Sequence, residues 1–442
     1  MILGYGRSGR AAASYLKRHG ATVVVVDRAD TPELRAAIER DGLSGWLGTL
    51  PAPPLDDVDF LVVSPGVAWD APLVESARQR GIVVTSEIDL FFDLCPCPIA
   101  GITGTNGKTT TTSLTAEVLR AGGLQVVRGG NIGEPVLDRL EQLRPDHWVV
   151  LELSSFQLES IRHPRLRIGA VLNVTPDHLD RHKTMERYRE IKARAVTFME
   201  PEDYAVLNFD DQSCAAMAKE TRGTVVPFAL QAETDGGLRV MDGSICWARE
   251  GRLEPVIPVG EVPLPGAHNL SNVMAAIGAG LAAGVAAERI AEAVRGFKAV
   301  EHRLELIGSF GQVRWYNDSK ATNPDSTYKA LEAFTEPIVL IAGGRNKGID
   351  LAPLASRIAQ RVVGLVTIGE TGEELARLVR AAGLQRVARA RNLSEAVHEA
   401  ASMATSGSVV LLSPAFTSFD MFSDYEDRGR RFKAAVLTEL GR

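Results

Sequence analysis

Cysteine is scarce in this chain of 442 residues, which has only four. Cys95, Cys97, Cys214 and Cys246 are too few and too scattered for a disulfide framework, and Cys95-Pro-Cys97 lacks the second ligand pair of a zinc site. We therefore expect unpaired thiols.

The chain also has no excess of basic residues. Its formal net charge is −6, which argues against a nucleic-acid-binding protein.

Long apolar runs are absent as well. No run approaches the roughly 18 residues that a membrane-spanning helix needs, and the opening Met-Ile-Leu leads straight into a glycine turn rather than a signal peptide. We expect a cytoplasmic protein without a membrane or nucleic-acid partner. The length predicts about three domains, and the charged content of 24% is that of an ordinary globular protein.

The strongest chemical signal lies between Ile99 and Thr112. Its apolar start predicts a buried strand, its glycine-rich middle a loop, and its end a helix. Loop N–H groups and the positive end of a helix dipole bind phosphate. Lys108 would then reach the outer phosphates, and the Thr109 hydroxyl would ligate Mg²⁺. A strict Walker A motif would have its first glycine at position 102, where this chain has Ile.

The amino-terminal region shows a second phosphate-binding pattern. Gly4, Gly6 and Gly9 form a G-x-G-x-x-G turn, and the predicted strand Val23–Val26 leads to Asp27. This is the fingerprint of a dinucleotide site, so an NAD-dependent dehydrogenase is a rival interpretation. The same turn suits any diphosphate, and the pattern therefore predicts a small α/β domain without fixing its ligand.

Two strands of the central region are predicted to end in polar turns. Trp148–Leu151 leads to Glu152, and Ala170–Asn173 leads to His178. A carboxylate at the carboxyl end of a parallel strand, near a phosphate loop, suits Mg²⁺. Taken alone, His178 is more typical of a packing histidine. Lys192 lies on a charged predicted helix, and such charges are usually solvated.

The last third of the chain repeats the pattern of strands followed by polar turns. The predicted strands Val313–Tyr316, Ile338–Ile341 and Val409–Leu412 would form a binding crevice at their carboxyl ends. Lys347 follows one of them, and by itself it is as typical of an ordinary surface lysine. A preceding alanine-rich helix is predicted over Val273–Ala283.

Several sequence blocks resemble one family. Thr103-Gly-Thr-Asn-Gly-Lys-Thr-Thr110 resembles the ATP loop of the Mur ligases and their folylpolyglutamate synthase relatives. The blocks that resemble the glutamate-adding branch, in order along nearly the whole chain, are Ser64-Pro-Gly66, Glu152-Leu-Ser-Ser-Phe-Gln-Leu-Glu159, Asn173-Val-Thr-Pro-Asp-His-Leu-Asp-Arg181 and Asn317-Asp-Ser-Lys-Ala-Thr-Asn323. The Asp-Asn-Pro-Arg motif of the branch that adds diaminopimelate or lysine is missing.

The resemblance implies a three-domain α/β fold. A Rossmann-like UDP-substrate-binding domain would span residues 1–93, a central P-loop ATPase-like domain with a mostly parallel sheet residues 94–297, and a Rossmann-like amino-acid-binding domain residues 298–442. The implied activity is ATP-dependent ligation of D-glutamate to UDP-N-acetylmuramoyl-L-alanine through an acyl phosphate, in peptidoglycan precursor synthesis. ATP, two Mg²⁺ ions and a carbamylated Lys192 are the implied cofactors, and a monomer is expected.

The resemblance also assigns site residues by position. The residues implied to bind ATP are Gly104, Thr105, Asn106, Gly107, Lys108, Thr109, Thr110, Asn272, Arg303 and Asp318, and those implied to bind the UDP-substrate are Arg7, Ser8, Asp27, Gly66 and Asn131. The amino acid would be bound by Thr322, Lys347, Ser418 and Phe419. Metal would be held by Thr109, Glu152, His178 and Lys192, and the implied catalytic residues are Lys108, His178 and Lys192. Asp27-Arg28-Ala29 departs from the family's Asp-Thr-Arg order, which leaves the uracil contacts open. The first strand is expected to be clipped at its start.

Two interpretations outside the ligase class remain beside this one. A dehydrogenase would leave the ATP loop and the third domain unexplained. A non-catalytic UDP-sugar-binding module would leave Glu152, His178 and the lysines without a role. Within the ligases, a sibling Mur ligase or a folylpolyglutamate synthase is the nearer alternative.

Overall fold

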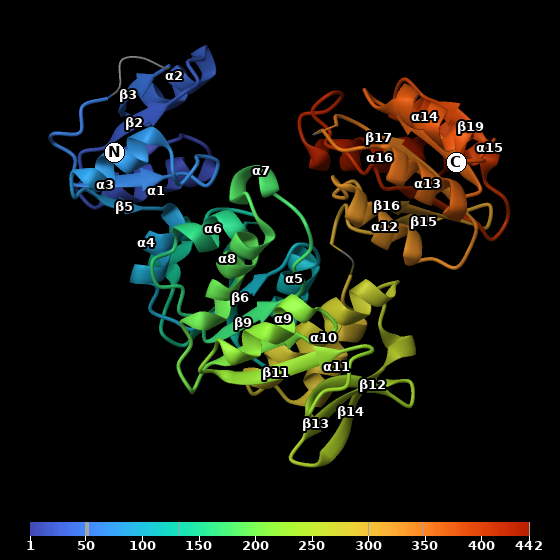
Figure 1. Ribbon diagram of the computed structural model, residues 1–442, viewed down its shortest axis with the longest axis horizontal. Coiled ribbons are helices and arrows are strands. Elements are labelled where there is room, and N and C mark those ends of the chain that lie inside the picture. The colour runs from blue at the N-terminus through green and yellow to red at the C-terminus, as the bar shows by residue number, and fades with distance from the viewer. Residues whose placement is uncertain (49–52, 132, 299, 347, 442) are drawn as a thin grey trace. The chain divides into compact units, whose positions relative to one another are not determined.

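The computed structural model describes residues 1–48, 53–131, 133–298, 300–346 and 348–441 (Figure 1). The chain forms two compact units, one made of Met1–Glu261 and Ser271–Arg295 and the other of Val262–Leu270 and Gly296–Arg442. Two β-sheets organise the first unit and one organises the second. Among the helices described, none is long and apolar enough to cross a membrane.

The first sheet is parallel throughout, with the strand order β3-β2-β1-β4-β5. Helices follow four of its described strands, β1, β2, β4 and β5, which is the pattern of a doubly wound α/β layer. Its strands are β1 (Ile2–Leu3), β2 (Val24–Asp27), β3 (Ser44–Leu47), β4 (Phe60–Val63) and β5 (Val83–Thr85), and its helices are α1 (Arg7–Arg18), α2 (Pro32–Arg40), α3 (Pro72–Gln79) and α4 (Glu87–Leu94).

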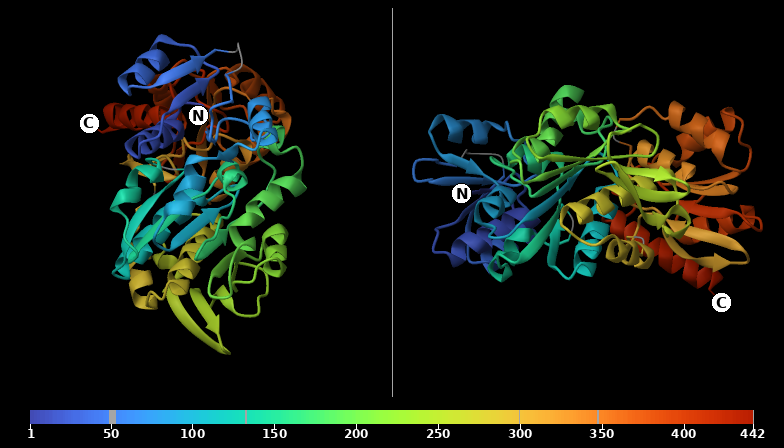
Figure 2. Two further views of the ribbon diagram at one scale, coloured as in Figure 1. Left: turned by 90° about the vertical axis from the view of Figure 1, so that its left-hand side faces the viewer. Right: turned by 90° about the horizontal axis from the view of Figure 1, so that it is seen from below.

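The second sheet has nine strands in the order β14-β13-β12-β11-β10-β9-β6-β8-β7. It is parallel from β7 to β12, and the antiparallel hairpin β13–β14 forms one end (Figures 1 and 2). Its strands are β6 (Ile99–Thr103), β7 (Gln125–Gly130), β8 (His147–Glu152), β9 (Ile168–Val171), β10 (Tyr204–Asn208), β11 (Thr224–Ala229), β12 (Gly237–Met241), β13 (Ser244–Arg249) and β14 (Arg252–Pro258). The helices along this stretch are α5 (Lys108–Ala121), α6 (Ser155–Ser160), α7 (Leu179–His182), α8 (Met185–Thr197), α9 (Gln212–Ala216), α10 (Ala267–Ala282) and α11 (Ala287–Gly296).

The third sheet has the order β15-β16-β20-β17-β18-β19, with only the β15–β16 pair antiparallel. Its apolar strands are covered on both faces, which explains their continuous hydrophobic sequence. In β17, Leu340 packs with α13 and α14, whereas the next residue, Ile341, packs with α15 and α16. The elements are β15 (Glu305–Phe310), β16 (Val313–Asn317), β17 (Ile338–Gly343), β18 (Gly364–Ile368), β19 (Val387–Arg389), β20 (Val409–Leu412), α12 (Pro324–Glu332), α13 (Ala352–Arg361), α14 (Gly372–Ala381), α15 (Leu393–Met403) and α16 (Tyr425–Leu440).

Two predicted elements, the strand Ala170–Asn173 and the helix Val273–Ala283, are displaced in the structure. β9 ends at Val171 rather than at Asn173. The Asn173 carbonyl accepts a hydrogen bond from the Thr105 N–H at 2.9 Å, and its side-chain oxygen accepts one from the Asn106 N–H at 2.8 Å, so Asn173 is bonded to the glycine loop rather than to a neighbouring strand. α10 begins at Ala267 rather than Val273. Gly266, which precedes it, lies in the left-handed region with a φ of 91°.

Candidate functional site

The loop between β6 and α5 has the conformation of a phosphate cradle. Gly104 and Gly107 have φ angles of 153° and 87°, which side-chain-bearing residues rarely adopt. A Cβ on Gly107 would lie 2.1 Å from the Asn272 Oδ1 atom, so glycine is required for this close approach. The N-cap residue of α5 is Gly107, so the positive end of the helix dipole lies directly at the glycine loop, where it favours an anion.

The same loop is held in place by the turn that follows β9. The Thr105 hydroxyl donates to the Thr175 carbonyl and accepts from the Thr175 N–H, both at 3.0 Å. Asn173 and Asn106 exchange two further bonds of 2.8 and 3.0 Å. Lys108 Nζ donates to the Gly104 and Thr105 carbonyls at 2.8 Å each. These bonds preform the loop, which lowers the ordering cost of binding a phosphate.

Glu152 ends β8 beside this loop, because it pairs with Ile102 of β6. Its carboxylate is buried and accepts a 2.9 Å hydrogen bond from Asn131 Nδ2, while its carbonyl accepts from the Asn131 N–H at 2.8 Å. The structure therefore brings together two residues that the sequence analysis assigned to different ligands. A buried carboxylate oriented by an amide is a suitable oxygen ligand for Mg²⁺.

His178 caps α7 in the left-handed conformation, with φ 53°. Its Nε2 lies 3.6 Å from the Asp177 Oδ2, and its ring stands edge-on to Phe156 at 4.9 Å between centroids. Phe156 also stacks on His182 at 5.4 Å. Burial, with help from the charges of Arg181 and other nearby groups, lowers the pKa of His182 to about 4, so this neighbour is neutral at physiological pH. Sequence reasoning passed over His182 because nothing in the pattern separates it from a surface residue.

Lys192 lies on the buried face of α8 with 1% of its surface exposed, so the expectation of a solvated charge is wrong for this residue. Its Nζ is 4.6 Å from the centroid of the Tyr188 ring, whose hydroxyl lies 3.3 Å from the Thr105 hydroxyl. Burial and the charge of Lys108 lower the pKa of Lys192 well below its usual value. A neutral amine is a nucleophile, whereas an ammonium is not.

The amino-terminal turn places its predicted residues in one loop cluster. A Cβ on Gly9 would lie 2.0 Å from the Gly4 carbonyl oxygen, so α1 begins tightly against the turn. The Asp27 carboxylate accepts hydrogen bonds from the Tyr5 and Ala29 N–H groups at 2.8 and 2.9 Å. Ser64 donates to the Gly4 carbonyl at 2.6 Å, which ties the turn that contains Gly66 to the one before Arg7 and Ser8.

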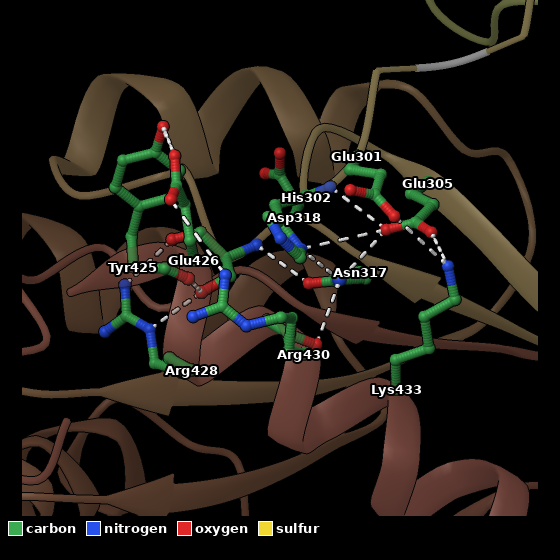
Figure 3. Close-up of polar contacts among 12 residues, drawn as sticks. Glu301, His302, Glu305, Asn317, Asp318, Tyr425, Glu426, Arg428, Arg430 and Lys433 are labelled. Carbon is green, nitrogen blue, oxygen red and sulfur yellow. Dashed lines mark hydrogen bonds and ion pairs between the residues drawn. The ribbon is translucent and has the colours of Figure 1, made fainter. Parts of the chain in front are cut away.

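In the second unit, Asp318, labelled in Figure 3, follows β16 and is buried. Its carboxylate accepts hydrogen bonds from Ser413 Oγ at 2.9 Å and from the Leu304 N–H at 3.3 Å. Burial raises the pKa of Asp318 to about 6, against the opposing charges of Arg303 and Arg428. Ser418 is buried and Thr322 half-buried, whereas Phe419 is 61% exposed. Lys347 lies outside the described residues.

Replacing Asp318 by Asn is expected to make stability less dependent on pH. A carboxyl group whose pKa is higher in the folded than in the unfolded state stabilises the fold when it is protonated. This contribution is fully present at a pH below the unfolded-state pKa of about 3.8, and it is lost as the pH rises through the folded-state pKa of about 6. At roughly 1.4 kcal/mol per pKa unit, the unfolding free energy of Asp318→Asn relative to wild type should rise by about 2.5 kcal/mol from pH 4 to pH 8.

Urea unfolding across that range measures this difference directly, and the exposed Asp350→Asn variant controls for loss of an aspartate side chain. A difference that stays constant from pH 4 to pH 8 would contradict the expectation.

No ready-made metal cage is present among the residues that the structure describes: no three His, Cys, Asp or Glu side chains gather to hold an ion. Mg²⁺ commonly binds through one or two carboxylates, several waters and substrate phosphates. The buried Glu152 carboxylate and the position of Thr109 at the start of α5 fit that mode. The full metal set of Thr109, Glu152, His178 and Lys192 stays a prediction.

Comparison with known proteins identifies the class. Residues 1–86 match the MurD-like N-terminal domain of Mur ligases, residues 102–280 the Mur ligase middle domain, and residues 302–416 the Mur ligase glutamate ligase domain. UDP-N-acetylmuramate-alanine ligase MurC from Thermotoga maritima superposes with a TM-score of 0.61 at 21% identity, covering 99% of this chain and 98% of that one. MurF ligase from the same organism, in complex with ADP, gives 0.62 at 16% identity and 95% coverage of both. These matches define a Mur ligase fold.

Sequence relatives then establish membership. A UDP-N-acetylmuramoylalanine–D-glutamate ligase of Pelotomaculum thermopropionicum is 43% identical over 445 residues, covering 99% of this chain and 97% of the relative. One from Koribacter versatilis is 42% identical over 439 residues, covering 99% and 96%. The chain belongs to the Mur ligase family. The predicted three-domain α/β fold is confirmed, and the dehydrogenase interpretation is excluded.

Proposed function

We propose that this chain is an ATP-dependent ligase that joins D-glutamate to UDP-N-acetylmuramoyl-L-alanine in peptidoglycan precursor synthesis. The observation that carries the proposal is the similarity, over 99% of the chain, to ligases of that name. The phosphate loop with its preformed hydrogen bonds supports it, because that loop can hold the phosphates of ATP. The Asn317–Asn323 block supports glutamate over diaminopimelate or lysine as the added amino acid.

The proposed reaction has two steps. An oxygen of the muramoyl-alanine carboxylate attacks the γ-phosphorus of ATP, ADP leaves, and an acyl phosphate forms. The glutamate amine then attacks the acyl carbon, loses a proton, and phosphate leaves. Lys108 offsets charge on the phosphoryl group during the first step, and the loop N–H groups orient it, so the protein contributes positioning and electrostatics.

The chain's residues also fit Mg²⁺ and a modified lysine. Thr109, Glu152 and His178 would hold metal near the ATP phosphates, where the ion would neutralise phosphate charge. Lys192 would join them as a carbamate: its neutral amine adds to carbon dioxide and loses a proton, which replaces a cation by oxygen ligands. The burial that lowers the pKa of Lys192 favours this addition, because an ammonium group has no lone pair for it.

The remaining assignments follow the family pattern. We place the UDP-substrate at Arg7, Ser8, Asp27, Gly66 and Asn131, the rest of ATP at Asn272, Arg303 and Asp318, and glutamate at Thr322, Lys347, Ser418 and Phe419. The domain boundaries at residues 93 and 297 belong to the same proposal, as does a cytoplasmic monomer. Asn131 contacts Glu152, so the UDP-substrate and the metal would meet at this pair.

Replacing Lys347 by Ala is expected to weaken glutamate use selectively. A charge-assisted hydrogen bond to a carboxylate is worth roughly 1.5–3 kcal/mol, so the KM for glutamate should rise about 10- to 150-fold. The KM values for ATP and the UDP-substrate should barely move, because those ligands are assigned mainly to other sites.

Steady-state kinetics with each substrate varied in turn measures these constants. Lys329→Ala is the matched control, since Lys329 lies on α12 and pairs with Asp325 at 2.9 Å. An unchanged KM for glutamate, or an equal loss for all three substrates, would move the amino-acid site elsewhere.

ADP release tests the proposed function itself. With UDP-N-acetylmuramoyl-L-alanine present, D-glutamate should give rapid turnover, whereas L-glutamate, diaminopimelate, lysine and alanine should give little. Release with a different amino acid would indicate a sibling ligase. Tight binding of the UDP-substrate without any ADP release would indicate a non-catalytic binding module.

A further inference from the structure

A buried arginine joins two turns at the carboxyl ends of neighbouring strands. Arg428, in the first turns of α16, has no exposed surface. Its guanidinium donates from Nε to Ser319 Oγ at 2.9 Å and from Nη2 to the Ser319 carbonyl at 2.8 Å. Its Nη1 donates to the Phe416 carbonyl at 3.1 Å. One rigid, planar group therefore fixes the spacing of two separate backbone segments.

The two turns that Arg428 joins carry the residues proposed for glutamate. Ser319 lies after β16, three residues before Thr322, and Phe416 lies after β20, two residues before Ser418. β16 and β20 are parallel neighbours with Asn317 opposite Leu412, so both turns leave the same edge of the sheet. The bond between Asp318 and Ser413 is a second link between them.

The hydrogen bonds of the Arg428 guanidinium go to Ser319 and Phe416, and the charges of Asp420 and Asp318 oppose the lowering of its pKa by burial. Within the described part of the chain, Arg428 forms no ion pair with an Asp or Glu. Burial lowers the pKa of Arg428 to about 10, which still leaves it protonated at neutral pH. A buried cation is costly unless it is compensated, and here the compensation comes from the hydrogen bonds to Ser319 and Phe416 together with the charges of Asp420 and Asp318. The Ser319 hydroxyl also donates to the Tyr425 carbonyl at 2.8 Å, which closes the link to α16.

The helix is docked just as closely at the next residue. A Cβ on Gly429 would lie 2.2 Å from His302 Nδ1, and the Gly429 carbonyl accepts from Asn317 Nδ2 at 3.3 Å (Figure 3). The Asn317 side chain also contacts His302 and Glu305, at 2.9 and 3.1 Å. The start of α16 therefore has little freedom to shift and hold the two turns at another spacing.

We propose that Arg428 is a positioning residue for glutamate: it sets the distance between the turn of Thr322 and the turn of Ser418, and so the fit of the amino acid between them. The inference rests on the proposed function. Arg428 does not touch the substrate in this account; it acts through the Ser319 and Phe416 carbonyls. Loss of the bridge should weaken glutamate binding more than the binding of ATP or the UDP-substrate.

The test compares Arg428→Gln, Arg428→Lys and Ser319→Ala with wild type and with Arg430→Gln, a control at a 60% exposed side chain of the same helix. Arg428→Gln should raise the KM for D-glutamate at least 10-fold while the KM for the UDP-substrate stays within twofold. Arg428→Lys, which keeps the charge but cannot span both carbonyls in the same way, should fall between Gln and wild type. Ser319→Ala, a smaller change, should raise the KM about 3- to 10-fold, and Arg430→Gln should leave it unchanged.

Comparing the changes in KM and in kcat distinguishes a positioning role of Arg428 from an effect on folding alone. A purely structural role would lower the folded fraction, reducing the apparent kcat with an unchanged KM for glutamate, and that result would overturn the inference. Equal KM increases for all three substrates would also overturn it. If Arg428→Gln does not fold, Ser319→Ala decides alone by the same criterion. Absence of D-glutamate-dependent ADP release in wild type would instead refute the proposed function.

Discussion

Alanine at Lys108 or Thr109 should abolish ligation while binding of the UDP-substrate survives. Lys108 begins α5 directly after the glycine loop and is the residue proposed to offset charge on the ATP phosphates. Removing one preorganised electrostatic contact typically costs about 100- to 1000-fold in kcat, and the Lys108 variant should reach at least the upper figure. Apart from Asn131, the residues assigned to the UDP-substrate lie at turns of the first sheet, which share no residue with this loop.

Calorimetric titration with the UDP-substrate, together with ADP release, measures the two properties separately. Lys219→Ala is a matched control, because Lys219 is an exposed lysine of the same compact unit. Thermal unfolding is needed beside it, since Lys108 also holds the Gly104 and Thr105 carbonyls. Folded variants that no longer bind the UDP-substrate would show that the two sites are not independent.

The second large effect is expected at Lys192. Lys192→Ala should be nearly inactive, and added formate or acetate should restore part of the activity. The substitution opens a space at a side chain that is 1% exposed, and a short carboxylate there would supply the oxygen that a carbamate otherwise presents to Mg²⁺. Because carbamates are often lost before intact-mass measurement, the kinetic rescue is the decisive readout.

Lys192→Met is the control for that experiment, since it fills the space without an oxygen and should be inactive with or without added acid. The Lys192→Met variant should also unfold at a higher temperature than wild type, because burying the Lys192 amine costs desolvation free energy that an apolar side chain does not cost. Activity near that of wild type in Lys192→Ala would end the carbamate proposal.

Local sequence predicted the sheets well because their signals are local. Apolar strands followed by glycine or polar turns mark β6, β8, β16, β17 and β20, and all five are present with ends within two residues of the prediction. β9 is shifted by two residues at both ends from the predicted Ala170–Asn173, and Asn173 itself forms hydrogen bonds to a loop about 70 residues away in sequence. Such long-range bonds have no counterpart in hydrophobic periodicity.

Burial of charge was the part that the sequence did not reveal. Lys192 lies among charged neighbours on α8, and Arg428 lies in the segment Glu426-Asp-Arg-Gly-Arg-Arg431, so both resemble solvated residues in sequence. Each is enclosed because another part of the chain packs over it, as the Ser319 and Phe416 turns do for Arg428. The family pattern proposes which residues form the site, whereas the burial and hydrogen-bond partners of those residues required the tertiary structure.

Isotope transfer tests the central claim most directly. The UDP-substrate labelled with ¹⁸O in its alanine carboxylate is incubated with ATP, Mg²⁺ and D-glutamate, and the phosphate released is examined by mass spectrometry. If the carboxylate attacks the γ-phosphorus, each phosphate released carries one ¹⁸O atom, and ADP forms in equal amount with the glutamyl product. Unlabelled phosphate, or label appearing in AMP, would contradict the account.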